Sequence, residues 1–430
     1  MDELRLGSLL LEGGIVDEAG LERCLAIQTL TGNTRPIGRI LIEQGLMDEP
    51  TLTRLLDLQK HRVQETRAKV PDQDLTSASL LTAARANGAS ELVVSEGRSA
   101  RIRVGPDWRQ LSDQVLSGPE VWDFLRETMG SSVLETLAEQ RFVAQPWRSE
   151  GIGYGSAFAF RQCEGVAVRL TFAPETVPTP ASLGVPQVVL DTINHGKGLV
   201  LVVGERGIGR AAVLASLVHA AAADKSRYVV LVDDEPCELP TTGAMVVQRR
   251  FGHAATQQAA ALRSVVREDP DALIVGDVGN LEAFDTALRA AEGGRLVIGY
   301  IDAATTVHAL TRVLNLYPVY ELPRVRATLA AVLRVVFVRH LLPDLDHTGN
   351  VPVTELVVVD DVVREVVRRG ELADISLLLR DEKRGAGHSL DRCMLDLLTA
   401  GVVRMEDVFA RAEEKAWLLE RTRNLETVAR

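Results

Sequence analysis

Cysteine is scarce in this 430-residue sequence, and the four cysteines lie far apart. No two of them form a C-x-x-C pair, so the sequence shows neither a zinc site nor a disulfide framework and favours a reducing compartment. Aromatic residues make up only 4%, and no apolar run approaches the roughly 18 residues that a membrane-spanning helix needs. Lys and Arg number 48 against 59 Asp and Glu, and the net charge of −11 argues against a nucleic-acid partner.

Hydrophobic residues are plentiful at 46%, which is enough for packed cores. The length is typical of about three domains. The N-terminus has neither a basic nor an apolar leader segment. We therefore expect a cytoplasmic protein without zinc, a membrane span or a nucleic-acid partner.

The segment 198–211 reads G-L-V-L-V-V-G-E-R-G-I-G-R-A. It resembles a phosphate-binding loop, in which a buried strand, the sequence G-x-x-x-x-G-K-[ST] and a helix follow one another. We predict a strand over Leu199–Val203 and a helix over Ala211–Ala222. Arg210 stands where the lysine belongs, and Ala211 stands where a hydroxyl would hold Mg²⁺. The predicted ATP phosphate loop comprises Gly204, Glu205, Arg206, Gly207, Ile208, Gly209, Arg210 and Ala211.

The two replacements weaken the chemistry that this loop performs. A guanidinium still contacts phosphate oxygens, so ATP or ADP binding remains open and is expected to be weak, with Mg²⁺ bound only beside a nucleotide. Without the lysine and the hydroxyl, most of the charge neutralisation for phosphoryl transfer is missing. The loop therefore argues against an enzyme.

Residues 5–28 and 36–59 repeat each other with an offset of 31. Each unit is predicted to form two short helices broken at a glycine, which gives an all-α repeat domain over residues 1–62. Internal repeats commonly stack and share a core. On that interpretation the repeated leucines need no ligand.

The first unit resembles the R-L-G-x-x-φ-φ-x-x-G pattern of the MshEN domain, where φ is aliphatic. That domain is found at the start of many secretion and pilus ATPases and binds cyclic di-GMP. The arginine fork suits a guanine edge, and the glycine allows backbone N–H groups to approach a phosphate. The second unit has Pro36 in place of the arginine, so a docking module that keeps only the fold stays open. The resemblance implies a cyclic di-GMP site made of Arg5, Leu6, Gly7, Leu10, Gly14, Leu21, Leu25, Gln28, Arg35, Ile37, Gly38, Leu41, Gly45, Leu52, Leu56 and Gln59.

The rest of the chain divides by composition and strand pattern. We predict a linker over 63–75, a small α+β, PAS-like domain over 76–175 and a second linker over 176–186. Alternating strands and helices then predict an α/β, RecA-like phosphate-loop domain over 187–360, followed by a helical region over 361–430. The predicted strands are Glu91–Ser95, Arg101–Val104, Tyr228–Asp233, Ala272–Asp277, Arg295–Ile301 and Leu333–Val338.

Five further segments resemble motifs of type II secretion and type IV pilus ATPases. Residues 267–277, R-E-D-P-D-A-L-I-V-G-D, match that family's Walker B run. Residues 232–236, V-D-D-E-P, stand at its acidic box, and residues 293–303 match its histidine box. Residues 89–92 and 390–395 resemble its small-domain signature and its C-terminal tail.

The departures from the family pattern fall on catalytic positions. Asp277 replaces a glutamate and draws the carboxylate back by roughly 1.5 Å, and errors of that size can cost about a hundredfold in rate. Arg295 and Asp302 replace the two histidines. No residue is assigned a catalytic role, and the degenerate candidates are Asp234, Glu235 and Asp277.

These features predict a regulatory pseudo-ATPase that senses cyclic di-GMP and modulates a pilus or secretion motor by protein contacts. One alternative is a weakly active ATPase that powers type IV pilus or type II secretion dynamics, and another is an inert structural adaptor. The family assembles as hexameric rings, which implies self-association or a mixed ring with active motor subunits. A peripheral place at the inner-membrane platform of such a machine also stays open.

Two local predictions complete the set. Asp360 and Asp361 are expected to cap the helix that carries Arg364. The charged stretch 406–430 is expected to form one solvated helix, docked by Trp417 and Leu418.

Overall fold

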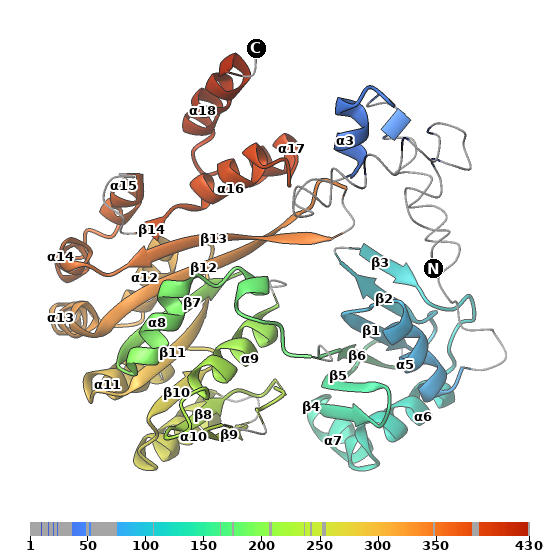
Figure 1. Cartoon of the computed structure of the whole chain (residues 1–430). Helices are drawn as coiled ribbons and strands as arrows, with labels where there is room; N and C mark the ends of the chain where they lie inside the picture. The colour runs from blue at the N-terminus through green and yellow to red at the C-terminus, as the bar shows by residue number, and fades with distance from the viewer. Residues whose placement is uncertain are drawn as a thin grey trace. The chain divides into compact units, whose positions relative to one another are not determined.

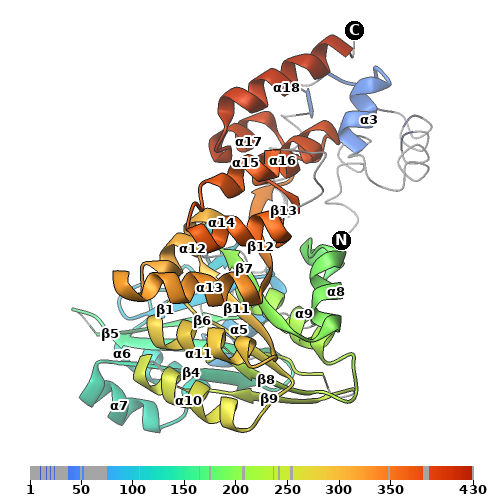
Figure 2. The same ribbon diagram turned by 90° about the vertical axis from the view of Figure 1, so that its left-hand side faces the viewer.

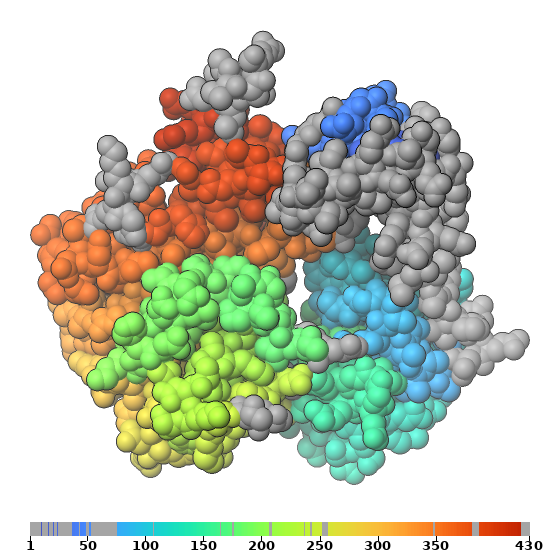
Figure 3. Space-filling model, in the orientation of Figure 1, coloured from blue at the N-terminus to red at the C-terminus, as the bar shows by residue number. Residues whose placement is uncertain are grey.

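The computed structural model describes most of the chain, and the residues outside that part are grey in Figure 3. The described residues are 10, 16, 20, 24, 37–48, 51–52, 75–105, 107–163, 165–173, 176–205, 209–235, 237–240, 243–251, 255–346, 349–380 and 387–428. The chain forms two compact units, one of Met1–Lys69, Leu341–Val351 and Leu390–Arg430, the other of Val70–His340 and Pro352–Ser389. No helix among the described residues is long and apolar enough to cross a membrane.

An antiparallel six-stranded sheet forms the first part of the larger unit, with strand order β3-β2-β1-β6-β5-β4 (Figure 1). Alternate strand residues such as Leu92, Ala157 and Leu170 pack with three helices in one core. The strands are β1 (Glu91–Ser95), β2 (Arg101–Val104), β3 (Asp107–Gln110), β4 (Phe142–Ser149), β5 (Gly153–Arg161) and β6 (Val166–Thr171). The helices are α5 (Ser77–Ala86), α6 (Gly118–Met129) and α7 (Ser132–Gln140). The small α+β domain and the predicted β1 and β2 are confirmed.

A mixed eight-stranded sheet forms the rest of this unit, with strand order β14-β13-β12-β7-β11-β10-β8-β9. The strands from β12 through β9 in this order run parallel, and β13 pairs antiparallel with β14. The strands are β7 (Gly198–Gly204), β8 (Tyr228–Val232), β9 (Met245–Arg249), β10 (Ala272–Val275), β11 (Leu296–Asp302), β12 (Leu333–Pro343), β13 (Asn350–Val358) and β14 (Gly387–His388).

Helices cover both faces of this sheet. Successive side chains along β7 point to opposite faces of the sheet. Leu201 therefore packs in a core shared with α10 to α14, and Val202 packs in a second core shared with α8 and α9. Figure 2 shows α11 and α13 across the first face. The helices are α8 (Gln187–His195), α9 (Arg210–Ala221), α10 (Ala255–Arg267), α11 (Leu281–Glu292), α12 (Thr306–Leu314), α13 (Leu322–Val332), α14 (Asp361–Arg369) and α15 (Asp374–Arg380).

Strands β9, β13 and β14 were not predicted from the sequence. β9 lies at the edge of the sheet and is only partly buried, so it has no long apolar run. β13 follows β12 directly along the chain, without the crossover helix that marks the other strands. The expected alternation of helices and parallel strands therefore predicted the central strands of the sheet and missed the strands at its two edges.

The C-terminal prediction was right at its start and wrong at its end. The Asp360 carboxylate accepts hydrogen bonds from the backbone N–H groups of Val362 and Val363, which confirms the cap of α14. The tail is not one helix but two, α17 (Met405–Arg411) and α18 (Lys415–Val428), which follow α16 (Leu390–Thr399). The break is stabilised by the Asp391 carboxylate, which accepts hydrogen bonds from the N–H groups of Glu413 and Glu414. Leu418 is fully buried, as expected.

The N-terminal repeat is described at few positions. Helix α3 (Ile37–Glu43) belongs to the second unit of the repeat. Leu10 and Leu41 occupy equivalent positions in the two units, and both are fully buried in one cluster. This pairing fits repeats that share a core, while the all-α character of the whole repeat stays a prediction.

Candidate functional site

The phosphate-loop region has the strand, loop and helix order that the sequence predicted. β7 is buried along its whole length, and α9 begins at Arg210. Gly209 has a φ of +78°, a left-handed conformation that favours glycine, and it lies at the N-terminal end of α9. Gly204, Glu205 and Ala211 are described, whereas the predicted site residues Arg206, Gly207 and Ile208 lie outside the described residues.

The Arg210 side chain is directed toward the acidic box. Its Nη1 donates a hydrogen bond to the carbonyl oxygen of Gly276 at 2.9 Å. Its Nη2 lies 3.3 Å from Asp233 Oδ1 and 3.0 Å from Glu235 Oε1. Its guanidinium carbon lies 5.7 Å from the centre of the Tyr300 ring. We refer to these five residues as the Arg210 cluster.

The charges of this cluster are mutually dependent. Burial alone lowers the pKa of Arg210, but the Asp233 and Glu235 carboxylates outweigh that effect and hold it above its ordinary value. Burial raises the pKa of Asp233 to about 6, against the opposing charge of Arg210 and with the help of Glu235. Asp233 therefore depends on the guanidinium for its charge at neutral pH.

We expect Asp233 to make the stability of the protein depend on pH. Its pKa of about 6 in the folded state exceeds the ordinary 3.8, so the folded protein binds this proton at a higher pH than the unfolded chain does. The free energy of unfolding should fall by roughly 2–3 kcal/mol from this residue as the pH rises from about 4 to about 7. Urea unfolding of the wild type and of Asp233→Asn across this range measures the effect, which should be absent from the variant. Identical pH profiles would contradict the assignment.

The other carboxylates at this edge of the sheet have protein partners. Asp234 accepts a hydrogen bond from the N–H of Phe251 at 2.8 Å. Asp277 lies directly beyond β10, and its Oδ1 accepts a hydrogen bond from the N–H of Gly279 at 2.7 Å. The described part of the chain contains no group of three or more His, Cys, Asp or Glu side chains that could hold a metal ion. With Ala211 in place of a hydroxyl, these residues do not fit Mg²⁺-ATP.

Two residues that the sequence analysis did not single out contact the phosphate loop. The hydroxyl of Tyr300 donates a hydrogen bond to the Gly204 carbonyl at 3.0 Å. His340, near the end of β12, has its Nδ1 3.7 Å from Glu205 Oε2 and its Nε2 2.6 Å from the Ala304 carbonyl oxygen. Both follow from the parallel strands, whose carboxyl ends meet at one edge. The sequence predicted a strand ending at Val338, and the position of His340 just beyond that strand end was the signal that could have placed it at the site.

The two histidine-box replacements lie at opposite ends of β11. Asp302 is the last residue of that strand and is paired with Gly204. Arg295 precedes the strand and forms an ion pair with Asp269. Only Asp302 therefore lies beside the phosphate loop, and the loss of the first histidine has no visible bearing on the site.

The predicted cyclic di-GMP residues are described in part. Leu10 and Leu41 are buried in the shared cluster, with Ile37 packed against it. A Cβ on Gly38 would lie 2.8 Å from a methyl carbon of Leu52, so a larger residue here would require the Leu52 side chain to shift. The described positions are Leu10, Ile37, Gly38, Leu41, Gly45 and Leu52. Outside the described residues lie Arg5, Leu6, Gly7, Gly14, Leu21, Leu25, Gln28, Arg35, Leu56 and Gln59.

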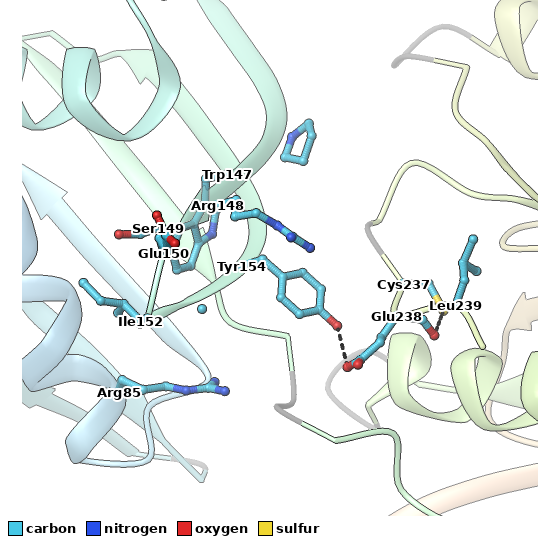
Figure 4. Close-up of a pocket in the computed structure, with 13 residues that line it drawn as sticks. Arg85, Trp147, Arg148, Ser149, Glu150, Ile152, Tyr154, Cys237, Glu238 and Leu239 are labelled. Atoms are coloured by element: carbon cyan, nitrogen blue, oxygen red, sulfur yellow. Dashed lines mark hydrogen bonds between the residues drawn. The ribbon is translucent and has the colours of Figure 1, made fainter. Parts of the chain in front are cut away.

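A cavity of about 1130 Å³ lies next to the acidic box (Figure 4). Arg85, Arg148 and Tyr154 line one side and Glu238 lines the other, with the Tyr154 hydroxyl 3.5 Å from Glu238 Oε2. Burial raises the pKa of the Cys237 thiol in its lining to about 12. This thiol therefore stays protonated and is no nucleophile at neutral pH.

The fold and this edge of the sheet define a RecA-like phosphate-loop protein with a small antiparallel-sheet domain before it. The family model described as "Type II/IV secretion system protein" matches residues 182–409, more than half of the chain. The chain belongs to this family.

Relatives in this family include pilus motors. The type IV pilus retraction ATPase PilT of Pseudomonas aeruginosa is 27% identical over 343 residues, which cover 79% of this chain and 98% of PilT. The type IV pilus ATPase PilU of the same organism is 24% identical over 328 residues, 76% of this chain and 86% of PilU. A crystal structure of the pilus retraction motor PilT with bound ADP superposes with a TM-score of 0.69 at 27% identity, over 79% of this chain and 98% of that one. The chain is therefore a PilT- and PilU-like member of the family.

Proposed function

We propose that the chain acts as a subunit of a type IV pilus or type II secretion motor whose own nucleotide site contributes little or no ATP hydrolysis. The relatives support the motor part of this proposal, since PilT and PilU are pilus ATPases. They favour the motor role of the weakly active alternative over the regulatory sensor hypothesis.

The Arg210 cluster carries the part of the proposal that concerns activity. In a working site, positive charge on lysine and Mg²⁺ neutralises the transferring phosphoryl group. Here Arg210, the cation at the start of helix α9, is bonded to Asp233 and Glu235. That charge is therefore already balanced inside the protein.

A slow ATPase is the second candidate. The described part of the site keeps its strand and helix order, with Asp277 beyond β10 and Gly209 at the start of α9. A guanidinium released from the acidic box would reach phosphate oxygens. This candidate gains if Mg²⁺-ATP turnover is measurable and falls on Arg210→Ala.

Mixing with an active motor tests the proposed function directly. The chain is combined with a purified pilus retraction ATPase, and co-elution and phosphate release are measured. We expect a mixed assembly whose turnover differs from that of the active motor alone. Separate elution with unchanged turnover would contradict the proposal.

Binding of cyclic di-GMP by residues 1–62 is a further part of the proposal, supported by the sequence pattern alone. In calorimetric titration of the full chain, Arg5→Ala should weaken binding by about 1–3 kcal/mol, because its fork would read a guanine or phosphate. Arg23→Ala, in the same unit but outside the pattern, is the matched control and should bind as the wild type does. If the wild type gives no heat with cyclic di-GMP, this part of the proposal is wrong and the repeat is better explained as a docking module.

A further inference from the structure

We propose that this site takes a nucleoside diphosphate or triphosphate without a divalent cation, because Arg210 serves as the built-in cation of the acidic box. The inference rests on the proposed function and names the form of its ligand. Its starting point is geometric. One nitrogen, Nη2 of Arg210, lies within 3.3 Å of carboxylate oxygens from both Asp233 and Glu235.

A divalent ion would have to displace this guanidinium. Mg²⁺ in phosphate sites is held by hard oxygen ligands, commonly a hydroxyl and a carboxylate. The hydroxyl is absent at Ala211, and the Asp233 side chain is only 7% exposed and faces Arg210. A metal ion entering here would lie beside the half-buried positive charge of Arg210, which like-charge repulsion disfavours.

The backbone at Gly276 also holds the Asp233 carboxylate and the Arg210 guanidinium in place. A Cβ on Gly276 would lie 2.2 Å from Asp233 Oδ2, so the glycine leaves the room that this carboxylate occupies. The Gly276 carbonyl holds Nη1 of Arg210 at the same time. Tyr300 covers the guanidinium while its hydroxyl is bonded to the Gly204 carbonyl. The cation is therefore held by residues at the ends of β8 and β10 together with Tyr300 of β11.

The guanidinium keeps donors for an anion. It has five N–H groups. Those of Nη2 contact Asp233 and Glu235, and one N–H of Nη1 is bonded to the Gly276 carbonyl. Among the described residues, Nε has no hydrogen-bond partner given by the structure. Phosphate oxygens at the start of α9 would meet this donor together with the first backbone N–H groups of the twelve-residue helix. A nucleotide anion without its metal is the ligand that these donors match.

The test is a calorimetric titration of the full chain with ADP, once with Mg²⁺ and once with EDTA. We expect dissociation constants that agree within a factor of about two. In the double variant Arg210→Lys with Ala211→Ser, Mg²⁺ should tighten ADP binding by about tenfold or more, because the acidic box is open again. Arg364→Lys, in a surface pair on α14, is the matched control and should behave as the wild type does.

A second measurement uses the metal alone. Titration with Mn²⁺ is followed by its paramagnetic signal. We expect the wild type and Asp233→Asn to give the same signal, with no Mn²⁺ site that depends on Asp233. Tighter ADP binding with Mg²⁺ in the wild type, or such a Mn²⁺ site, would overturn the inference. Absence of ADP binding in both buffers would overturn it as well, while the motor-subunit proposal would stand. Mg²⁺-ATP turnover that Arg210→Ala abolishes would instead overturn the proposed function.

Discussion

Replacing Arg210 by alanine is expected to lower the free energy of unfolding by about 2–4 kcal/mol. Removal of one partner from a buried ion pair leaves the other charge without compensation, which typically costs about 3–5 kcal/mol, and we place the effect lower because the Arg210 side chain is 25% exposed. The Asp233 carboxyl, with 7% of its side chain exposed, would lose the cation that stabilises its charged form and would stay buried without that partner. Denaturant unfolding at neutral pH measures the change.

Two further variants separate this effect from the loss of a large side chain. Adding Asp233→Asn to Arg210→Ala should recover part of the stability, because the buried acid that has lost its partner is removed as well. Arg364→Ala removes an arginine from a pair whose Asp361 side chain is 96% exposed, and it should cost at most about 1 kcal/mol. Equal losses of unfolding free energy for Arg210→Ala and Arg364→Ala would show that the Arg210 cluster stabilises the protein no more than a surface ion pair does.

The double substitution Arg210→Lys with Ala211→Ser is expected to leave ATP hydrolysis at background. It restores the lysine and the hydroxyl of the phosphate loop but not the rest of the site. Asp277 stays one methylene short, and its Oδ1 accepts a hydrogen bond from the Gly279 N–H. A misplacement of about 1 Å can cost roughly a hundredfold in rate.

Phosphate release measured with this double variant, with and without Asp277→Glu, distinguishes the two defects. Turnover that appears only in the triple variant supports Asp277 as the second defect. Full turnover in the double variant alone would contradict this part of the account.

The central strands were predictable because they are buried on both sides. β7, β10 and β11 appear in the sequence as continuous apolar runs, and the predicted ranges agree with the strands to within two residues. The edge strand β9 and the break before α18 depend on tertiary contacts instead. The break is stabilised by Asp391, more than twenty residues earlier in the chain, which no local pattern reveals.

The site was predictable in its residues and not in its geometry. The sequence identified Arg210, Glu235 and Asp277 as departures from a family pattern, but it could not show that Arg210 and Glu235 contact each other. It also treated Arg295 and Asp302 alike, although they lie at opposite ends of β11. The carboxyl ends of parallel strands bring distant residues together, and that juxtaposition is a property of the sheet.

Steady-state phosphate release by the purified full chain with Mg²⁺-ATP tests the central claim most directly. The account predicts a rate equal to that of the protein-free control, and the same rate for Arg210→Ala. A steady turnover in the wild type that Arg210→Ala abolishes would contradict it.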